Sequence, residues 1–183
     1  RLIGVTCQKE MSIDNPEYED LYDIGTVAEI VKILEMPDSS STVILQGKKR
    51  FHLDNLTTLD PYLKGNITLL EDELPVENDK EFEALISAIK ELTFKILKTL
   101  GEPTRELSFA LRNIDNSYYL INFLCSNIPI VAQQKQELLN IGSLKQRAFS
   151  LYASLSKEAQ LIQIKADIQS KTREDINQQQ REH

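Results

Sequence analysis

Tryptophan is absent from this chain of 183 residues, and Phe, Tyr and Trp together make up only 7% of it. Single-stranded nucleic acids are often bound on stacked aromatic side chains, and this composition offers no such platform. No apolar run approaches the roughly 20 residues that span a bilayer. No basic segment followed by an apolar one indicates a signal peptide either. We therefore expect neither a membrane partner nor an aromatic platform for nucleic acid.

Cysteine and histidine occur only twice each. Cys7 and Cys125 lie far apart, so a disulfide framework is not expected, and a reducing compartment such as the cytoplasm fits best. Both are interpreted as small buried apolar residues. His52 and His183 have no Cys or His neighbour at ligand spacing, so we predict no metal site.

Signatures of catalysis are also missing. The six glycines do not pair at the spacing of a P-loop, and no Gly-x-Ser-x-Gly motif occurs. His52 alternates with Phe51 and Leu53, which favours a structural histidine over a general base. The acidic run 71–73 is interpreted as a solvated linker, with a cation site as the alternative. We predict no catalytic, cofactor-binding or metal-binding residue, and no enzyme activity in this chain.

Charge is unevenly distributed along the chain. The net charge is −7, and residues 1–78 hold 7 Lys and Arg against 15 Asp and Glu. Residues 79–183 hold 14 against 13. An acidic front half repels phosphate backbones and disfavours nucleic acid as a partner. The basic run 48–50 is interpreted as a solvated hairpin end, with a phosphate site as the alternative.

The front half has the pattern of β-strands, predicted at residues 2–8, 24–34, 42–46, 51–53 and 62–70. The turn-forming run 37–41 makes residues 24–46 a long hairpin. Gly47 is interpreted as a bulge. Several strands without intervening helices indicate a small barrel or sandwich. Because a strand is already under way at Arg1, we expect the natural N-terminus to lie upstream.

The second half has helical spacing. Asn78 and Glu81 form a capping-box pattern, and Gly101 suits the end of the helix they begin. The apolar face of this helix consists of Phe82, Ile86, Ile89, Thr93, Ile96 and Leu100. Shorter helices are predicted at 105–113, at 117–126 with Asp115 as cap, and at 129–140.

Ser143 and Gln146 repeat the capping pattern, and no Gly or Pro follows them. This predicts a helix of roughly 40 residues, about 60 Å long. Its apolar seam consists of Ala148, Tyr152, Leu155, Ala159, Ile162 and Ala166, and Ile176 continues it alone. The polar end is expected to project into solvent or to pair with other chains, with a frayed terminus as the alternative.

Several strings resemble the N-terminal domain of Lon-type ATP-dependent proteases. They are Gln8-Lys9-Glu10, Asn15-Pro16, the segment from Asp20 to Ile30, Gly47 with Arg50, Ile114-Asp115-Asn116, the segment from Lys135 to Leu139, and Gln180-Arg181-Glu182. The family's first strand is missing upstream of Arg1, which leaves an edge. Ala148 stands where the family usually has Leu, and Asn140 where it has an acidic residue.

The resemblance implies an α+β fold in which a small PUA-like β barrel is followed by an α-helical subdomain ending in a long protruding helix. The expected boundaries are 1–75, 79–142 and 143–183. The resemblance also implies a homohexameric cytoplasmic parent that uses ATP and Mg²⁺ and degrades misfolded and regulatory proteins. Its P-loop and Ser-Lys dyad would lie beyond His183, so no cofactor is expected here.

The expected role is the capture of unfolded or degron-bearing proteins. The candidate contact residues are Tyr18, Leu21, Tyr22, Leu34 and Met36, because loop-borne aromatic and Met side chains suit promiscuous apolar binding. For Leu21 and Tyr22, packing onto the barrel is the alternative. A second hypothesis is a scaffold that organises the hexamer through Leu155, Ile162 and Ile176. The third is a PUA-like nucleic-acid-binding module.

Overall fold

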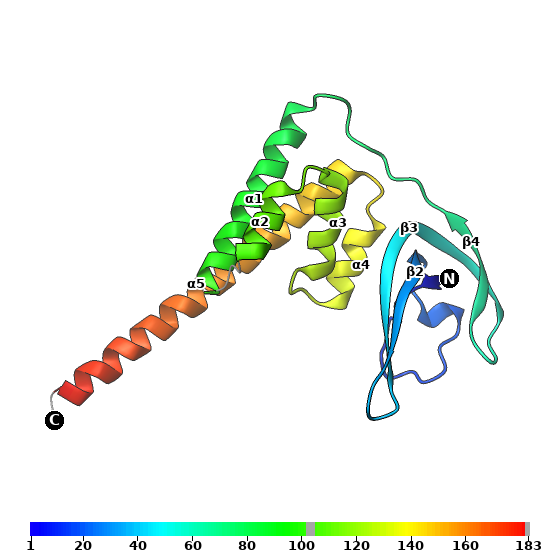
Figure 1. Ribbon diagram of the computed structural model, residues 1–183, viewed down its shortest axis with the longest axis horizontal. Coiled ribbons are helices and arrows are strands. Elements are labelled where there is room, and N and C mark those ends of the chain that lie inside the picture. Colours follow the sequence, from blue (N-terminus) through cyan, green and yellow to red (C-terminus); the bar gives the residue numbers. More distant parts are fainter. Residues whose placement is uncertain (102–104, 182–183) are drawn as a thin grey trace. The chain divides into compact units, whose positions relative to one another are not determined.

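The computed structural model describes residues 1–101 and 105–181 (Figure 1). The strands are β1 (Leu2–Val5), β2 (Ile24–Glu35), β3 (Ser41–Thr58) and β4 (Lys64–Leu69). The helices are α1 (Lys80–Thr99), α2 (Arg105–Asn113), α3 (Ser117–Asn127), α4 (Ala132–Asn140) and α5 (Leu144–Arg181). A short 3₁₀ helix, η1 (Tyr18–Asp20), lies between β1 and β2. The order of strands followed by helices agrees with the α+β class expected from the sequence.

The described strands form one antiparallel sheet in the order β1-β2-β3-β4. Its small core consists of Leu21, Phe51 and Leu53, with Tyr18, Val27 and Leu56 packed around them. Gly25 is required where β2 passes this core. A Cβ atom there would lie 2.4 Å from the Val5 carbonyl oxygen and 2.5 Å from the Phe51 ring.

β3 is one strand of 18 residues, although the sequence predicted two separate strands around Gly47. Gly47 pairs with Ala28, and the next residue of β2, Val27, pairs with Lys49. Lys48 is therefore the extra residue of a bulge, which lets β3 bend without ending. The predicted hairpin over 24–46 is confirmed, but its second strand continues through the whole sheet.

The chain divides into two compact units. One comprises residues 1–73 and 131–142, and the other comprises 74–130 and 143–183. This division differs from the expected boundaries, because the segment 131–142 joins the sheet. Gln136 Nε2 donates to the Ile24 carbonyl oxygen at 2.8 Å, and the Glu73 amide donates to the Gly142 carbonyl oxygen at 3.0 Å. The long helix α5 belongs with α1 and α3.

The helical unit has its own core, supplied by α1, α2, α3 and α5. Its fully buried members are Ile89, Leu120, Ile121, Ala148 and Leu151. α1 buries Phe82, Leu85, Ile89 and Thr93, whereas Leu100 at its end is 60% exposed. Leu100 was therefore wrongly predicted to be on the buried face. Leu100 caps the end of α1, and Gly101 follows at φ 81°.

The helix caps were predicted to within one to three residues. Asp79 rather than Asn78 caps α1, since its side chain accepts from the Phe82 amide at 3.0 Å. Asn116 rather than Asp115 caps α3, and α4 begins at Ala132 instead of Pro129. The cap at Ser143 is confirmed, because its hydroxyl accepts from the Gln146 amide at 3.4 Å.

α5 spans 38 residues, roughly 57 Å at 1.5 Å per residue, which confirms the long helix. Its first three turns are buried through Leu144, Ala148, Leu151 and Leu155. From about residue 167 to residue 178 its side chains are exposed. Among residues 1–101 and 105–181, no helix combines the length and apolar character needed to cross a membrane.

Candidate functional site

Two of the predicted contact residues belong to the core of the sheet. Leu21 is only 3% exposed and packs with Phe51 and Leu53. Tyr18 packs against the same cluster, and its hydroxyl donates to the Leu53 carbonyl oxygen at 3.0 Å. Burial therefore removes Leu21 from the candidate surface, and Tyr18 is held by the sheet. For Leu21 the alternative interpretation, packing onto the barrel, is correct.

Tyr22 is half-buried where the loop after β1 is fastened to the sheet. Its amide donates to the Cys7 carbonyl oxygen at 2.9 Å, and its carbonyl oxygen accepts from the Thr6 hydroxyl at 2.7 Å. An isolated bridge between Gln8 and Leu21 closes the same loop. The loop is thus folded back by its own backbone, which holds Leu21 and Tyr22 against the sheet, whereas Met11 in the same loop is 88% exposed.

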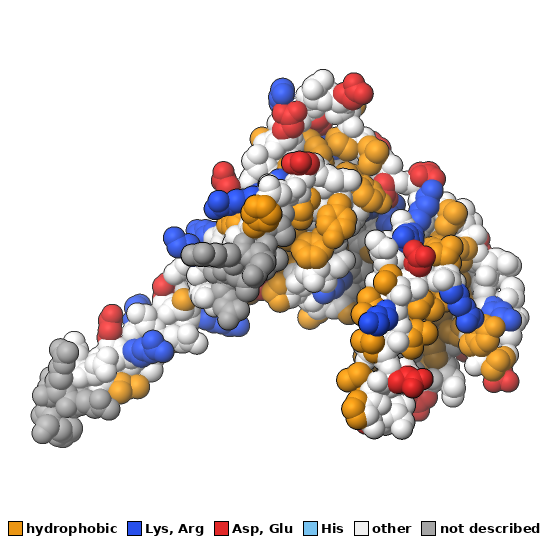
Figure 2. Space-filling view, in the orientation of Figure 1, with side chains coloured by type: hydrophobic (Ala, Val, Ile, Leu, Met, Phe, Trp, Pro, Cys, Tyr) orange, Lys and Arg blue, Asp and Glu red, His pale blue; other side chains and the backbone are white. Residues whose placement is uncertain are grey.

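Leu34 and Met36 lie on the distal half of the β2–β3 hairpin, residues 31–45, which we call the hairpin arm. Both side chains are exposed, and the arm exposes five further large apolar residues. The seven are Val31, Ile33, Leu34, Met36, Val43, Ile44 and Leu45, each between 36% and 60% exposed. Figure 2 shows apolar side chains gathered along the hairpin on the face in view.

The register places apolar side chains on both faces of the arm. Ile33 pairs with Val43, and both project to one face. The neighbouring pairs, Leu34 with Thr42 and Lys32 with Ile44, project to the other. A two-stranded ribbon with apolar residues on both faces has no inner side on which to bury them. Such a ribbon is suited to binding another apolar chain.

The turn that closes the arm is well defined. The Met36 amide donates to the Ser40 carbonyl oxygen at 2.8 Å, and Ser39 adopts φ 64°. The Asp38 carboxylate accepts from the Ser40 hydroxyl at 2.6 Å and from the Ser40 amide at 3.0 Å. These bonds lower the pKa of Asp38 from its usual value. The turn therefore orders the end of the arm.

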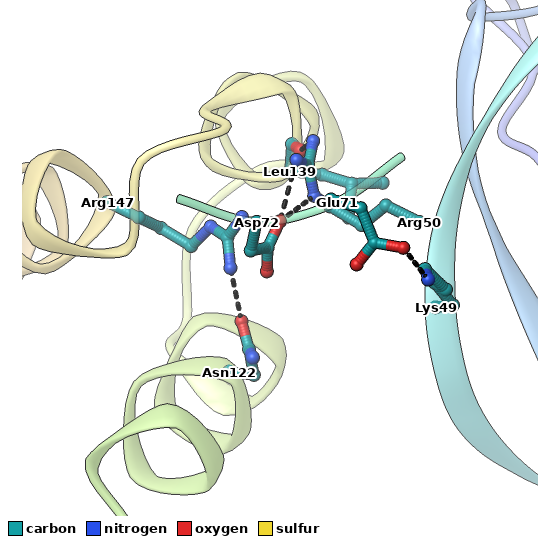
Figure 3. A network of polar contacts seen from close by, with 7 residues as sticks. All are labelled: Lys49, Arg50, Glu71, Asp72, Asn122, Leu139 and Arg147. Carbon is teal, nitrogen blue, oxygen red and sulfur yellow. Dashed lines mark hydrogen bonds and ion pairs between the residues drawn. The ribbon is translucent and has the colours of Figure 1, made fainter. Parts of the chain in front are cut away.

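Beyond the arm along β3, charged side chains fasten the sheet to the segments that carry Glu71, Asp72 and Leu139 (Figure 3). Arg50 donates through Nε to Asp72 at 2.7 Å and through Nη1 to the Leu139 carbonyl oxygen at 3.0 Å. The Arg50 and Asp72 side chains are only 8% and 7% exposed. Lys49 pairs with Glu71 beside them. Asp72 was therefore wrongly interpreted as part of a solvated linker.

Potential metal-ligating side chains are scattered over the part of the chain that the structure describes. No cluster of three His, Cys, Asp or Glu residues there could hold a metal ion. His52 Nδ1 lies 2.8 Å from Asp54, and the Thr68 hydroxyl donates to the other carboxylate oxygen at 2.8 Å. These bonds lower the pKa of Asp54, but no hydroxyl donates to the imidazole there. Burial raises the pKa of the Cys125 thiol to about 11, so it is protonated at neutral pH.

The three residues predicted to organise an assembly lie in different surroundings along α5. Leu155 is buried in the helical core, Ile162 is half-buried, and Ile176 is 49% exposed. Leu155 is therefore unavailable for contact with another chain. The exposed apolar stripe on the second half of α5 consists of Leu161, Ile164, Ile168 and Ile176.

A family model described as the ATP-dependent protease La (LON) substrate-binding domain matches residues 1–157. The chain belongs to the Lon substrate-binding domain family. A Lon protease from Parabacteroides distasonis is 58% identical over 182 residues, and one from Porphyromonas gingivalis is 44% identical over 182 residues. These matches cover 100% and 98% of this Lon domain, which spans about a fifth (22%) of each relative.

The fold agrees with the same family. The N-terminal domain of a Mycobacterium avium complex Lon protease superposes with a TM-score of 0.63 at 14% identity. The match covers 85% of this chain and 90% of that one. The expected resemblance and fold are thus confirmed for this Lon domain.

Sequence reasoning found Leu34 and Met36 but missed the rest of the hairpin arm. Val31, Ile33, Val43, Ile44 and Leu45 resemble ordinary buried strand residues in the sequence. A signal was nevertheless present in the lengths of the strands. β1 pairs with β2 only as far as Glu29, and β4 pairs with β3 only from Phe51 onwards. A 12-residue β2 must therefore project beyond its short neighbours.

Proposed function

We propose that this Lon domain is the non-catalytic substrate-recognition region of an ATP-dependent serine protease. In this proposal the hairpin arm captures apolar segments that unfolded or degron-bearing proteins expose. ATP and Mg²⁺ binding and peptide hydrolysis reside in the remainder of the parent protein, which degrades misfolded and regulatory proteins. The free thiols of Cys7 and Cys125 fit a cytoplasmic setting.

The observation that carries the proposal is the exposure of seven large apolar side chains within residues 31–45. Contiguous apolar surface of this kind commonly marks an interaction site. Only three of the fifteen positions are charged: Glu35 and Asp38 are acidic, and Lys32 is basic. Contacts with the arm therefore depend mainly on apolar burial, which is non-directional and tolerates many sequences.

Weak binding by one arm is compatible with this function. Several copies in one assembly would engage one unfolded chain at several places, and the linked contacts would raise the overall affinity without new interactions. Met36 adds a flexible side chain that adapts to differently shaped apolar groups. The arm thus suits substrates that share exposure of apolar groups rather than a sequence.

The double variant Leu34→Ser/Met36→Ser tests this function. We expect its affinity for a fluorescently labelled, permanently unfolded protein to fall at least fivefold, because two exposed apolar contacts are lost. The matched control, Leu74→Ser/Val76→Ser, removes side chains that are 62% and 75% exposed but lie outside the arm. Titrations followed by fluorescence anisotropy measure both. Unchanged binding by the arm variant, or equal losses in both variants, would contradict the assignment.

A second candidate function is assembly through α5. Leu161, Ile164 and Ile168 follow one another at spacings of three and four, and Ile176 continues the stripe two turns later. Such a stripe on an exposed helix is typical of helix pairing. We propose that it supports self-association in the parent homohexamer, in addition to recognition by the arm.

A further inference from the structure

The outer edge of β3 has no neighbouring strand in the hairpin arm, as far as the described residues extend. β3 pairs with β2 from Ser41 onwards, whereas its pairing with β4 begins only at Phe51. Every residue from Ser41 to Lys48 is exposed. The backbone groups of this stretch that point away from β2 can therefore accept a further strand.

The two edges of the arm differ in their protection against such pairing. The β2 edge contains the charged residues Lys32 and Glu35, and Val31 is the extra residue of a bulge. Charges and bulges are the usual means by which edge strands avoid pairing. The β3 edge from Ser41 to Gly47 contains no charged residue and no proline. Four consecutive pairs, from Ser41 to Ile44, keep a regular register with β2.

The residues of the β3 edge also favour extended structure. Thr42, Val43 and Ile44 are β-branched, and their side chains project alternately to the two faces of the arm. A strand added beside them would place its own side chains next to Val43 and Leu45 on one face and next to Ile44 on the other. Cross-strand apolar pairs of this kind stabilise a sheet.

We propose that an extended segment of an unfolded protein adds to the arm as a third strand along Thr42–Gln46. This proposal rests on the proposed function and specifies how the arm binds. Main-chain hydrogen bonds are the same for every sequence, so strand addition recognises segments that share no motif. The uncharged edge with apolar neighbours selects segments rich in β-branched and aromatic residues and poor in charge and proline.

The same edge could in principle pair with the β3 edge of a second copy. We assign it to a substrate because the arm lies inside the region matched by the substrate-binding family model. A substrate segment also needs only one free edge, whereas self-pairing would occupy the edges of two copies. The two occupants are distinguished by hydrogen exchange. A substrate segment protects the backbone amides of the β3 edge only when peptide is added, whereas a second copy protects them without peptide.

Two peptides of identical side chains test strand addition. The first is an uncharged peptide of alternating Val and Thr residues, and the second carries an N-methyl group on every residue. N-methylation at every residue removes the hydrogen-bond donors from both edges of the peptide and blocks pairing at either edge. We expect the methylated peptide to bind the 183-residue chain at least tenfold more weakly. Hydrogen exchange should show peptide-dependent protection within residues 42–46 and none within 31–35.

A pair of lysine variants tests the same edge from the protein side. Thr42→Lys adds a charge to the open edge without removing an apolar side chain. Thr57→Lys makes the same change at an exposed position of β3 that lies within the stretch paired with β4. We expect Thr42→Lys to weaken binding of the unmethylated peptide at least fivefold and Thr57→Lys to leave it unchanged.

The outcomes separate this proposal from the function on which it rests. Equal binding of both peptides, with a loss in Leu34→Ser/Met36→Ser, would overturn strand addition while the apolar capture function stood. Failure of the chain to prefer unfolded over folded protein would overturn the proposed function itself. Protection of residues 42–46 that appears with rising protein concentration and without peptide would assign the edge to a second copy and overturn the proposal.

Discussion

Arg50 illustrates how one charged residue can fix several parts of a small domain. Its guanidinium joins β3 to Asp72 and to the end of α4, while its carbonyl oxygen accepts from the Leu70 amide at 3.0 Å. Removing one partner of a buried ion pair leaves the other charge uncompensated in a poorly hydrated site. Loss of either partner is therefore expected to destabilise the sheet unit.

Arg50→Met is expected to lower the free energy of unfolding of the sheet unit by about 3–5 kcal/mol, because Asp72 keeps a buried charge without this partner. Urea denaturation measures the loss. Lys80→Met is the control, since it removes an ion pair with Glu83 whose side chains are 80% and 55% exposed. It should shift the midpoint far less. Equal shifts in both variants would show that burial of the Arg50 pair is energetically unimportant.

Asp79 is expected to make the helical unit sensitive to acid. Its carboxylate accepts from Lys145 at 2.8 Å and caps α1 through the Phe82 amide, and these bonds lower its pKa below the usual 3.8. A depressed pKa contributes stability above the unfolded pKa, and that stability is lost as the pH falls through the lowered value. The same pairing raises the pKa of Lys145 above its usual 10.5, so the Lys145 contribution is complete below 10.5 and is lost as the pH rises through the raised value.

The stabilisation by this pair is therefore present between about pH 4 and pH 10.5. Asp79→Asn should reduce the thermal midpoint at pH 7 and flatten its fall between pH 5 and pH 3. Thermal melting of both proteins across this range is the measurement. An unchanged acid dependence in Asp79→Asn would assign the acid sensitivity to other carboxylates.

At the scale of elements, local signals predicted most helices and the long hairpin. The turn at Pro37–Ser41, Gly101 and the cap at Ser143 were recognised because each depends on residues close in sequence. The continuity of β3 and the burial of Leu21 depend on partners distant in sequence. The segment 131–142 was placed with the helices for the same reason, since its attachment runs through Ile24, Arg50 and Glu73.

The candidate site was predicted in part, for a related physical reason. Leu34 and Met36 immediately precede a turn, so their exposure could be predicted locally. Ile33 and Val43 are exposed because the neighbouring strands β1 and β4 are too short to reach the arm. That fact depends on the whole sheet and cannot be predicted from the local sequence. Tyr18 was expected at the surface because it is an aromatic residue in a loop, yet its hydroxyl donates to the Leu53 carbonyl oxygen.

The exposed stripe of α5 leads to a prediction at this scale. Self-association of the chain should weaken in Ile164→Ser/Ile168→Ser, because these side chains are 54% and 58% exposed and would lose their apolar contacts between helices. Sedimentation velocity across a range of concentrations measures the change. The control Leu100→Ser/Phe109→Ser removes apolar residues of similar exposure at the C-cap of α1 and on α2. A mass distribution unchanged in the α5 variant, or changed equally in the control, would contradict pairing through this stripe.

At the scale of the whole molecule, the apolar residues that form the cores and the apolar residues that are exposed lie in separate parts of the chain. The core of the sheet and the core of the helical unit account for the folded structure. The hairpin arm and the end of α5 present apolar side chains outside both cores. In the proposed function, such a domain would bind unfolded chains without exposing the residues that keep it folded. This separation predicts that arm variants change binding while leaving the melting temperature nearly unchanged.

The most direct test is the affinity of the unmodified chain for one labelled protein in a permanently unfolded form and in its folded form. Titration of both forms under the same conditions gives the ratio of the two dissociation constants. Recognition of exposed apolar segments predicts at least tenfold tighter binding of the unfolded form, and loss of that preference in Leu34→Ser/Met36→Ser. Equal affinities for the two forms would contradict substrate capture by the hairpin arm.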